Sequence, residues 1–129
     1  MHEPVVCHIS RRVQFNTPGI GADFTVEVGH LPEAAICLAG LVVVHTAFNA
    51  ASTNVLTVGT DTGNDEFFDA ATSGATVTEG TAGAYSSSLV PGYTVGTGGE
   101  VVYVKYTQTG TAATTGDATV IITYVPRVG

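Results

Sequence analysis

The chain has 129 residues, of which 44% are hydrophobic and only 12% are charged. This length and composition fit one folded domain and exclude a chain that is disordered throughout. Eleven acidic residues against four basic ones give a net charge of −7. That balance excludes a nucleic-acid binder and a protein that docks on anionic membranes, because both need clustered Lys and Arg.

The composition predicts an all-β domain. Thr and Val are abundant and β-branched, which suits the half-buried surface of a sheet, and sixteen glycines supply turns. We expect about eight to ten short strands, from the segments 4–9, 12–15, 22–28, 35–48, 54–59, 66–71, 75–79, 85–90, 93–95, 100–109 and 117–125. The segment 66–71 fits one helical turn equally well.

Alternation of apolar and polar residues marks three strands that are buried on one face. The expected buried faces are Phe24, Val26 and Val28; Val102, Val104 and Tyr106; and Ala118, Val120, Ile122 and Tyr124. The long apolar run 35–48 predicts a central strand buried on both faces, with a bend or bulge at Gly40.

Turn signals recur about every ten residues, which predicts an antiparallel β-sandwich of jelly-roll-like form rather than a parallel sheet. Residues 1–21 are expected to form an N-terminal arm with the first strands, as part of the same unit, and residues 22–129 to form the sandwich. The N-terminus lacks the basic and apolar regions of a signal peptide, and the apolar run 34–44 is too short to span a bilayer.

The low charge has two interpretations. A surface of Thr, Ser, Ala and Gly loses little hydration energy when another protein covers it, which favours an interaction surface. Alternatively, the chain is a small Thr-rich domain that its negative charge keeps in solution.

The side chains that ligate metals show one weak pattern. Asp61, Asp65, Glu66 and Asp69 cluster in one expected loop, which is a candidate calcium site because Ca²⁺ prefers several carboxylate oxygens. The EF-hand pattern fails, since Glu66 stands where glycine belongs and Thr72 where the bidentate Glu belongs. The plainer interpretation is a solvated loop.

The remaining candidates give no metal or catalytic site. The four histidines, His2, His8, His30 and His45, lack zinc-ligand spacing, and His45 is expected to be a core or interface residue. Cys7 and Cys37 are expected to be buried thiols rather than a disulfide. Ser86–Ser88 lacks a nucleophile-elbow pattern, and no Lys follows Gly96–Gly99 as in a phosphate loop. We therefore expect no enzyme activity and no cofactor.

Arg11 and Arg12 hold half of the basic charge. One interpretation is that they bind an acidic partner surface. The other is that they are exposed charges on an edge strand, where they oppose pairing with other chains. The whole segment 1–12 is the expected contact to a partner.

Several phrases of the sequence are typical of one class of protein. They are residues 41–50 (LVVVHTAFNA), 54–60 (NVLTVGT), 67–71 (FFDAA) and 103–120 (YVKYTQTGTAATTGDATV). Together they resemble small Thr/Gly-rich structural proteins of tailed-bacteriophage virions, most closely capsid decoration (cement) proteins with a jelly-roll or related sandwich fold. The resemblance covers residues 22–125 and includes no catalytic residue.

The resemblance implies a protein that is made in the host cytoplasm and binds the outer surface of the assembled phage head. Its implied partners are the major capsid protein and itself, as a homotrimer that stabilises contacts between capsomers. One alternative is a head-fibre, tail or baseplate module. Another is a carbohydrate-binding module using Tyr85, Tyr93 or Tyr103, although the absence of Trp argues against it.

Overall fold

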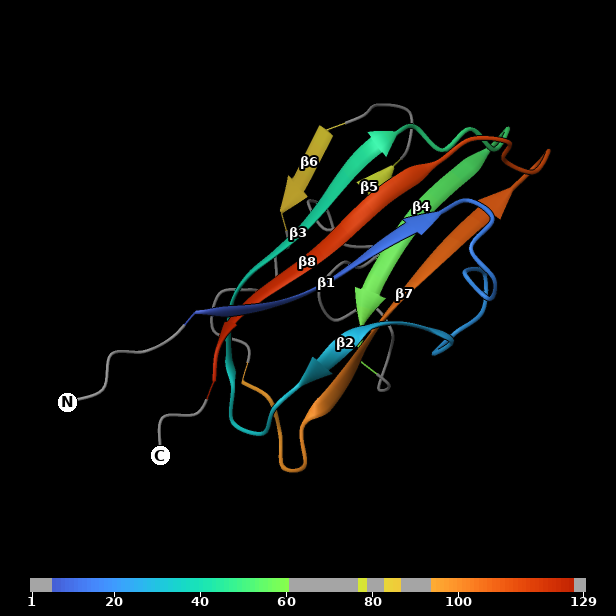
Figure 1. Ribbon diagram of the computed structural model, residues 1–129. Helices are drawn as coiled ribbons and strands as arrows, with labels where there is room; N and C mark the ends of the chain where they lie inside the picture. Colours follow the sequence, from blue (N-terminus) through green and yellow to red (C-terminus); the bar gives the residue numbers. More distant parts are fainter. Residues whose placement is uncertain (1–5, 61–76, 79–82, 87–93, 127–129) are drawn as a thin grey trace.

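The computed structural model describes residues 6–60, 77–78, 83–86 and 94–126. All the regular structure in this part of the chain is β, and it forms two stacked sheets (Figure 1). The strands are β1 (Cys7–Gln14), β2 (Val26–Leu31), β3 (Ile36–Thr46), β4 (Thr53–Gly59), β5 (Val77–Thr78), β6 (Gly83–Ser86), β7 (Glu100–Thr109) and β8 (Asp117–Val125).

Each sheet has four strands. The first, sheet A, has the order β1-β8-β3-β6, and the second, sheet B, has the order β2-β7-β4-β5. All the strand pairs are antiparallel. The chain crosses between the sheets at most of its connections, in the jelly-roll-like pattern of an eight-stranded double sheet. The predicted all-β antiparallel sandwich is confirmed.

The core lies between the inner faces of the two sheets and consists largely of valine. Alternation along the strands turns about every second residue inward. The largest fully buried side chains among the described residues are Leu31, Leu56, Ile122, Val13, Val42, Val58, Val102, Val104 and Val120. The predicted buried faces of β7 and β8 are confirmed by these positions, with Tyr124 only partly buried.

The first strand continues where the sequence predicted two. Cys7 to Gln14 pair with β8 without interruption, as part of sheet A. The ranges 61–76, 79–82 and 87–93 lie outside the described residues, and so do the predicted strand 66–71 and residues 87–90 of the predicted strand 85–90.

The second strand is shifted relative to its prediction. It begins at Val26 and runs through Gly29 to Leu31, with a register shift against β7 between Glu27 and Gly29. Phe24 was predicted on the buried face, and this is wrong: it precedes the strand, is 43% exposed and has a left-handed φ of 54°. Its ring contacts Tyr103 edge-to-face, with centroids 5.6 Å apart.

The prediction for 35–48 is partly wrong. β3 is internal to sheet A, but only one of its faces is buried, because Leu41 and Val43 on the other face are half-exposed and Leu38 is exposed. Two register shifts against β8 lie on either side of Gly40, between Cys37 and Ala39 and between Val44 and Thr46. The irregularity that Gly40 indicated is therefore present, but not at Gly40 itself.

Candidate interaction surface

The predicted metal-binding loop cannot be placed, because Asp61, Asp65, Glu66 and Asp69 lie outside the described residues. In the part of the chain that the structure describes, no three His, Cys, Asp or Glu side chains come close enough to hold a metal ion. The calcium loop stays a prediction.

The two cysteines lie on opposite sides of the same residue. Cys7 in β1 and Cys37 in β3 both pair with Tyr124 of β8, so their Cα atoms are separated by two strand spacings, roughly 9 to 10 Å. A disulfide needs a Cα–Cα separation below about 7 Å. Burial, with a smaller effect of Glu100, raises the pKa of Cys37 to about 11, which favours the protonated thiol at neutral pH.

Arg11 and Arg12 both have partners within the chain. The Arg12 guanidinium binds both carboxylate oxygens of Asp117, with Nε donating to Oδ1 over 2.8 Å and Nη2 donating to Oδ2. Arg11 Nη1 donates to the main-chain carbonyl of Glu27 over 3.2 Å, from sheet A to sheet B. The two arginines therefore tie β1 to β8 and to β2. Binding of an acidic partner by them stays a prediction.

The Arg12–Asp117 pair makes stability depend on pH. The hydrogen bond from Arg12 lowers the pKa of Asp117 against the opposing effect of its burial, and the charges of Arg12 and His45 and a hydrogen bond with Gln14 lower it further. The same hydrogen bond, followed by the charge of Asp117, raises the pKa of Arg12.

Asp117→Asn is expected to remove this pH-dependent stability. A carboxylate whose pKa is lower in the folded state stabilises the fold above its unfolded pKa of about 4, and this contribution is lost as pH falls through the lowered folded pKa. We would measure thermal unfolding from neutral to strongly acidic pH. The unfolding temperature of the wild type should exceed that of D117N at neutral pH, and this difference should disappear in acid. A difference in unfolding temperature that does not change with pH would show that ionisation of Asp117 does not stabilise the fold.

The outer face of sheet A is nearly free of charge. Alternation turns the odd-numbered residues of β8 outward, and among the described residues of this face Asp117 is the sole carboxylate, neutralised by Arg12. Apolar and hydroxyl side chains fill the rest, in the paired rows Ser10–Ile121–Leu41, Arg12–Thr119–Val43 and His8–Thr123–Ala39. On a chain of net charge −7, this face can be covered by another protein with little loss of ion hydration.

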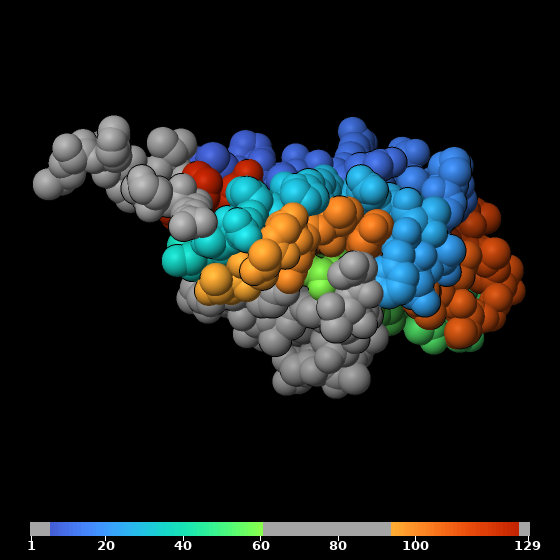
Figure 2. All heavy atoms as spheres, turned by 90° about the horizontal axis from the view of Figure 1, so that it is seen from below, coloured from blue at the N-terminus to red at the C-terminus, as the bar shows by residue number. Residues whose placement is uncertain are grey.

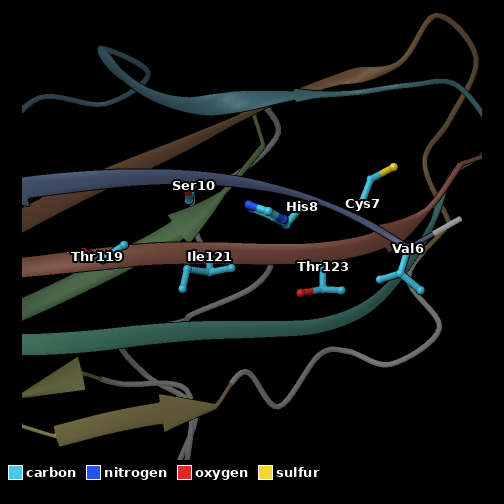
Figure 3. Close-up of a pocket in the computed structure, with 7 residues that line it drawn as sticks. All are labelled: Val6, Cys7, His8, Ser10, Thr119, Ile121 and Thr123. Carbon is cyan, nitrogen blue, oxygen red and sulfur yellow. The ribbon is translucent and has the colours of Figure 1, made fainter.

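A shallow pocket of about 330 Å³ lies on this face, where β1 meets β8 (Figure 3). Its lining is more apolar than polar and consists of Val6, Cys7, His8, Ser10, Thr119, Ile121 and Thr123. Val6 at its end is 60% exposed. The same face carries His45, which was expected in a core or an interface; it is exposed, and its Nε2 lies 2.8 Å from Thr119 Oγ1. The core alternative is therefore wrong.

The outer face of sheet B is different in character. It carries the Lys105–Asp23 ion pair, with Nζ and Oδ1 3.0 Å apart, and the exposed Glu27 and His30. Apart from the Arg12–Asp117 pair, the charged side chains that the structure describes lie on sheet B, at the Arg11 contact to it and in the loops beside it, and sheet A has the surface that fits a protein contact. Sequence reasoning missed this face, because the outward residues of β1, β3 and β8 come together only through strand pairing.

Among the described residues, no helix has the length and apolar character needed to cross a membrane. No protein-family model matches the sequence, and no curated protein matches it.

Two solved structures contain chains with the same fold. One is the "Cyanophage Pam1 capsid asymmetric unit", with 23% sequence identity and a TM-score of 0.73, over 96% of this chain and 86% of that one. The other is the "Acidic stable capsid structure of Helicobacter pylori bacteriophage KHP30", with 19% identity and a TM-score of 0.65, over 94% of this chain and 87% of that one. At these identities the likeness is one of fold.

Proposed function

We propose that this chain is a structural protein of a bacteriophage virion, and specifically a decoration protein that binds the outer surface of the assembled head. The observation that carries the proposal is the fold match, which spans nearly the whole chain and comes twice from phage capsid structures. The Thr/Gly-rich phrases that resemble decoration proteins support it independently of the fold.

The surface chemistry supports a protein contact on sheet A. The outer face of sheet A is close to neutral and carries exposed apolar side chains at Val6, Ile36 and Leu38. Burying such a face releases apolar surface from water and leaves the charged face of sheet B in solvent. If sheet A faces the shell, its apolar outer face is buried and the charged outer face of sheet B stays in water.

The mechanism would be mass action. A protein that binds only the assembled head stabilises that state by its binding free energy, summed over the many copies on the shell. A homotrimer would add avidity, because three linked contacts must be released together. No catalytic step, cofactor or metal enters this mechanism.

The test is reconstitution on heads that were assembled without this chain. We expect the purified protein to co-sediment with these heads, to saturate at many copies distributed over the shell, and to raise the temperature at which the heads release their DNA. Bovine serum albumin at the same concentration is the control for trapping. Light scattering on the unbound protein should give three times the chain mass if the trimer forms before binding.

Two outcomes would overturn the decoration role. If the protein does not co-sediment with heads, it does not bind them, and the proposal is wrong. Saturation at a few copies at one vertex would instead favour a head-fibre, tail or baseplate module, which is the alternative within the same class of virion protein.

A further inference from the structure

The four edge strands of the two sheets are not equally protected. β5 has two residues and β6 has four, so each offers little backbone for pairing. β2 has a register shift between Glu27 and Gly29, and the Glu27 carbonyl already accepts a hydrogen bond from Arg11. β1 is different: its eight residues pair with β8 in one unbroken register. A long, regular edge is the kind that proteins normally shield, because it can pair with another chain.

The hydrogen bonds show which groups of β1 point outward. Phe15 N donates to Gly116 O over 3.1 Å, one step beyond the last pair of the β1–β8 ladder. Since residues of an antiparallel edge strand alternate between bonding to the neighbour and facing away from it, the odd-numbered residues bond to β8.

The even-numbered residues therefore face the open edge. Gln14 agrees with this: Thr17 Oγ1 accepts from its N–H over 2.8 Å, and the Thr17 N–H donates to its carbonyl over 3.1 Å. His8, Ser10 and Arg12 remain. All three are exposed, and within the described ranges their N–H and C=O groups have no hydrogen-bond partner. In Figure 2 the atoms of β1 (blue) form the upper rim of the molecule.

The pocket on sheet A lies beside this open edge. Ser10 and Ile121 are register partners and both line it, and Figure 3 shows them on the neighbouring strands β1 and β8, with His8 and Thr123 further along. Ser10 has the smallest side chain of the three outward-facing residues His8, Ser10 and Arg12. An apolar side chain on a strand added outside β1, opposite Ser10, can reach over the serine to Ile121. Open backbone groups beside a side-chain pocket are the two parts of a strand-addition site.

We infer that β1 accepts an extended segment of a shell protein as a fifth strand of sheet A, paired with His8, Ser10 and Arg12. The segment carries an apolar side chain opposite Ser10. This inference rests on the proposed function and names the contact through which the head is bound. A second copy fits the edge less well, because antiparallel self-pairing centred on Ser10 places Arg12 of each copy against His8 of the other and brings the arginines of both β1 strands together.

The test compares Ser10→Pro with Ser10→Ala on heads assembled without this chain. Proline removes the Ser10 N–H and is tolerated on an edge strand, because that N–H makes no bond to another described residue. Alanine keeps the N–H. S10A is therefore the reference for S10P, because the two variants lose the same hydroxyl and differ in the N–H. We expect S10P to bind heads about tenfold more weakly than S10A, or worse, with both variants folded.

Amide hydrogen exchange provides a measurement that needs no variant. The amides of His8, Ser10 and Arg12 are expected to exchange quickly in the free wild type and to become protected on heads. Unchanged exchange there, or equal binding by S10P and S10A, overturns the inference and leaves the proposed function in place. Failure of the wild type to bind heads overturns both. A wild-type dimer that S10P converts to a monomer would assign the edge to a second copy instead.

Discussion

Asn54→Ala is expected to lower the free energy of unfolding by about 3 kcal/mol or more, because it leaves buried polar groups without their partner. Asn54 in β4 is buried, and its side chain holds both main-chain groups of Ala50: the Ala50 N–H donates to Oδ1 over 2.7 Å, and Nδ2 donates to the Ala50 carbonyl over 3.0 Å. The hydroxyl of Tyr106 donates to the same Oδ1 over 2.5 Å. One side chain thus joins the loop before β4 to the core face of β7.

The chain offers a matched control in Asn49. Its Oδ1 accepts from the main-chain N–H groups of Thr114 and Thr115, over 2.7 and 3.0 Å, so it also holds a loop, but it is exposed and water can replace it. Urea unfolding of N54A and N49A should show a loss for N54A that is at least twice that for N49A. Equal losses would mean that burial of the Asn54 network is not what stabilises the fold.

Gly116→Ala is expected to destabilise the protein by about 3 kcal/mol or more, or to prevent folding, because the added methyl group would overlap a buried ring. A Cβ on Gly116 would lie 2.3 Å from Cδ2 of Phe48, which is 2% exposed and packs against Tyr106 with ring centroids 4.7 Å apart. Gly116 also has a positive φ of 153° and accepts the hydrogen bond from Phe15 that extends the β1–β8 ladder.

Gly98→Ala separates the cost of the positive φ from the cost of the overlap with Phe48. Gly98 also has a positive φ, of 87°, but a Cβ there would meet nothing within 4 Å. G98A should therefore show only the cost of the backbone conformation, about 1 kcal/mol. Thermal unfolding of both variants checks this. A G116A protein as stable as G98A would show that Phe48 moves aside at little cost.

Two strands were predicted with the bounds that the structure has, and the reason is local. In β7 and β8 every second residue is apolar, at positions 102, 104 and 106 and at positions 118, 120, 122 and 124, and the residues between them include Lys105, Thr119 and Thr123. Gly98–Gly99 and Pro126 mark ends of these runs. Such alternation can be satisfied only by a strand with one face on a core. The pattern therefore specified the strand and its buried side together.

Two predictions failed where local pattern and packing disagree. Phe24 continues the alternation of Val26 and Val28, but the chain turns at Phe24 and its ring lies on the outer face against Tyr103. β3 is apolar on both faces, but the structure has nothing described over its outer one, so Leu41 and Val43 remain half-exposed. An apolar sequence shows that its side chains would be more stable when buried. It does not show whether another part of the protein covers them.

The candidate site depended most on tertiary structure. Arg12 and Asp117 are 105 residues apart, and only the pairing of β1 with β8 joins them. The open edge of β1 is likewise a property of strand order, since any strand has outward N–H groups until a neighbour occupies them. A list of residues contains no such order.

By itself the sequence determined the all-β class, the buried sides of β7 and β8 and the low charge that suits a protein contact, because each depends on composition or on neighbours along one strand. The tertiary structure was needed to establish which strands are edges, which face of sheet A has no other described segment over it and which polar groups are paired. These features arise from contacts between segments far apart in the chain, whose pairing energies differ too little for local sequence to select among them.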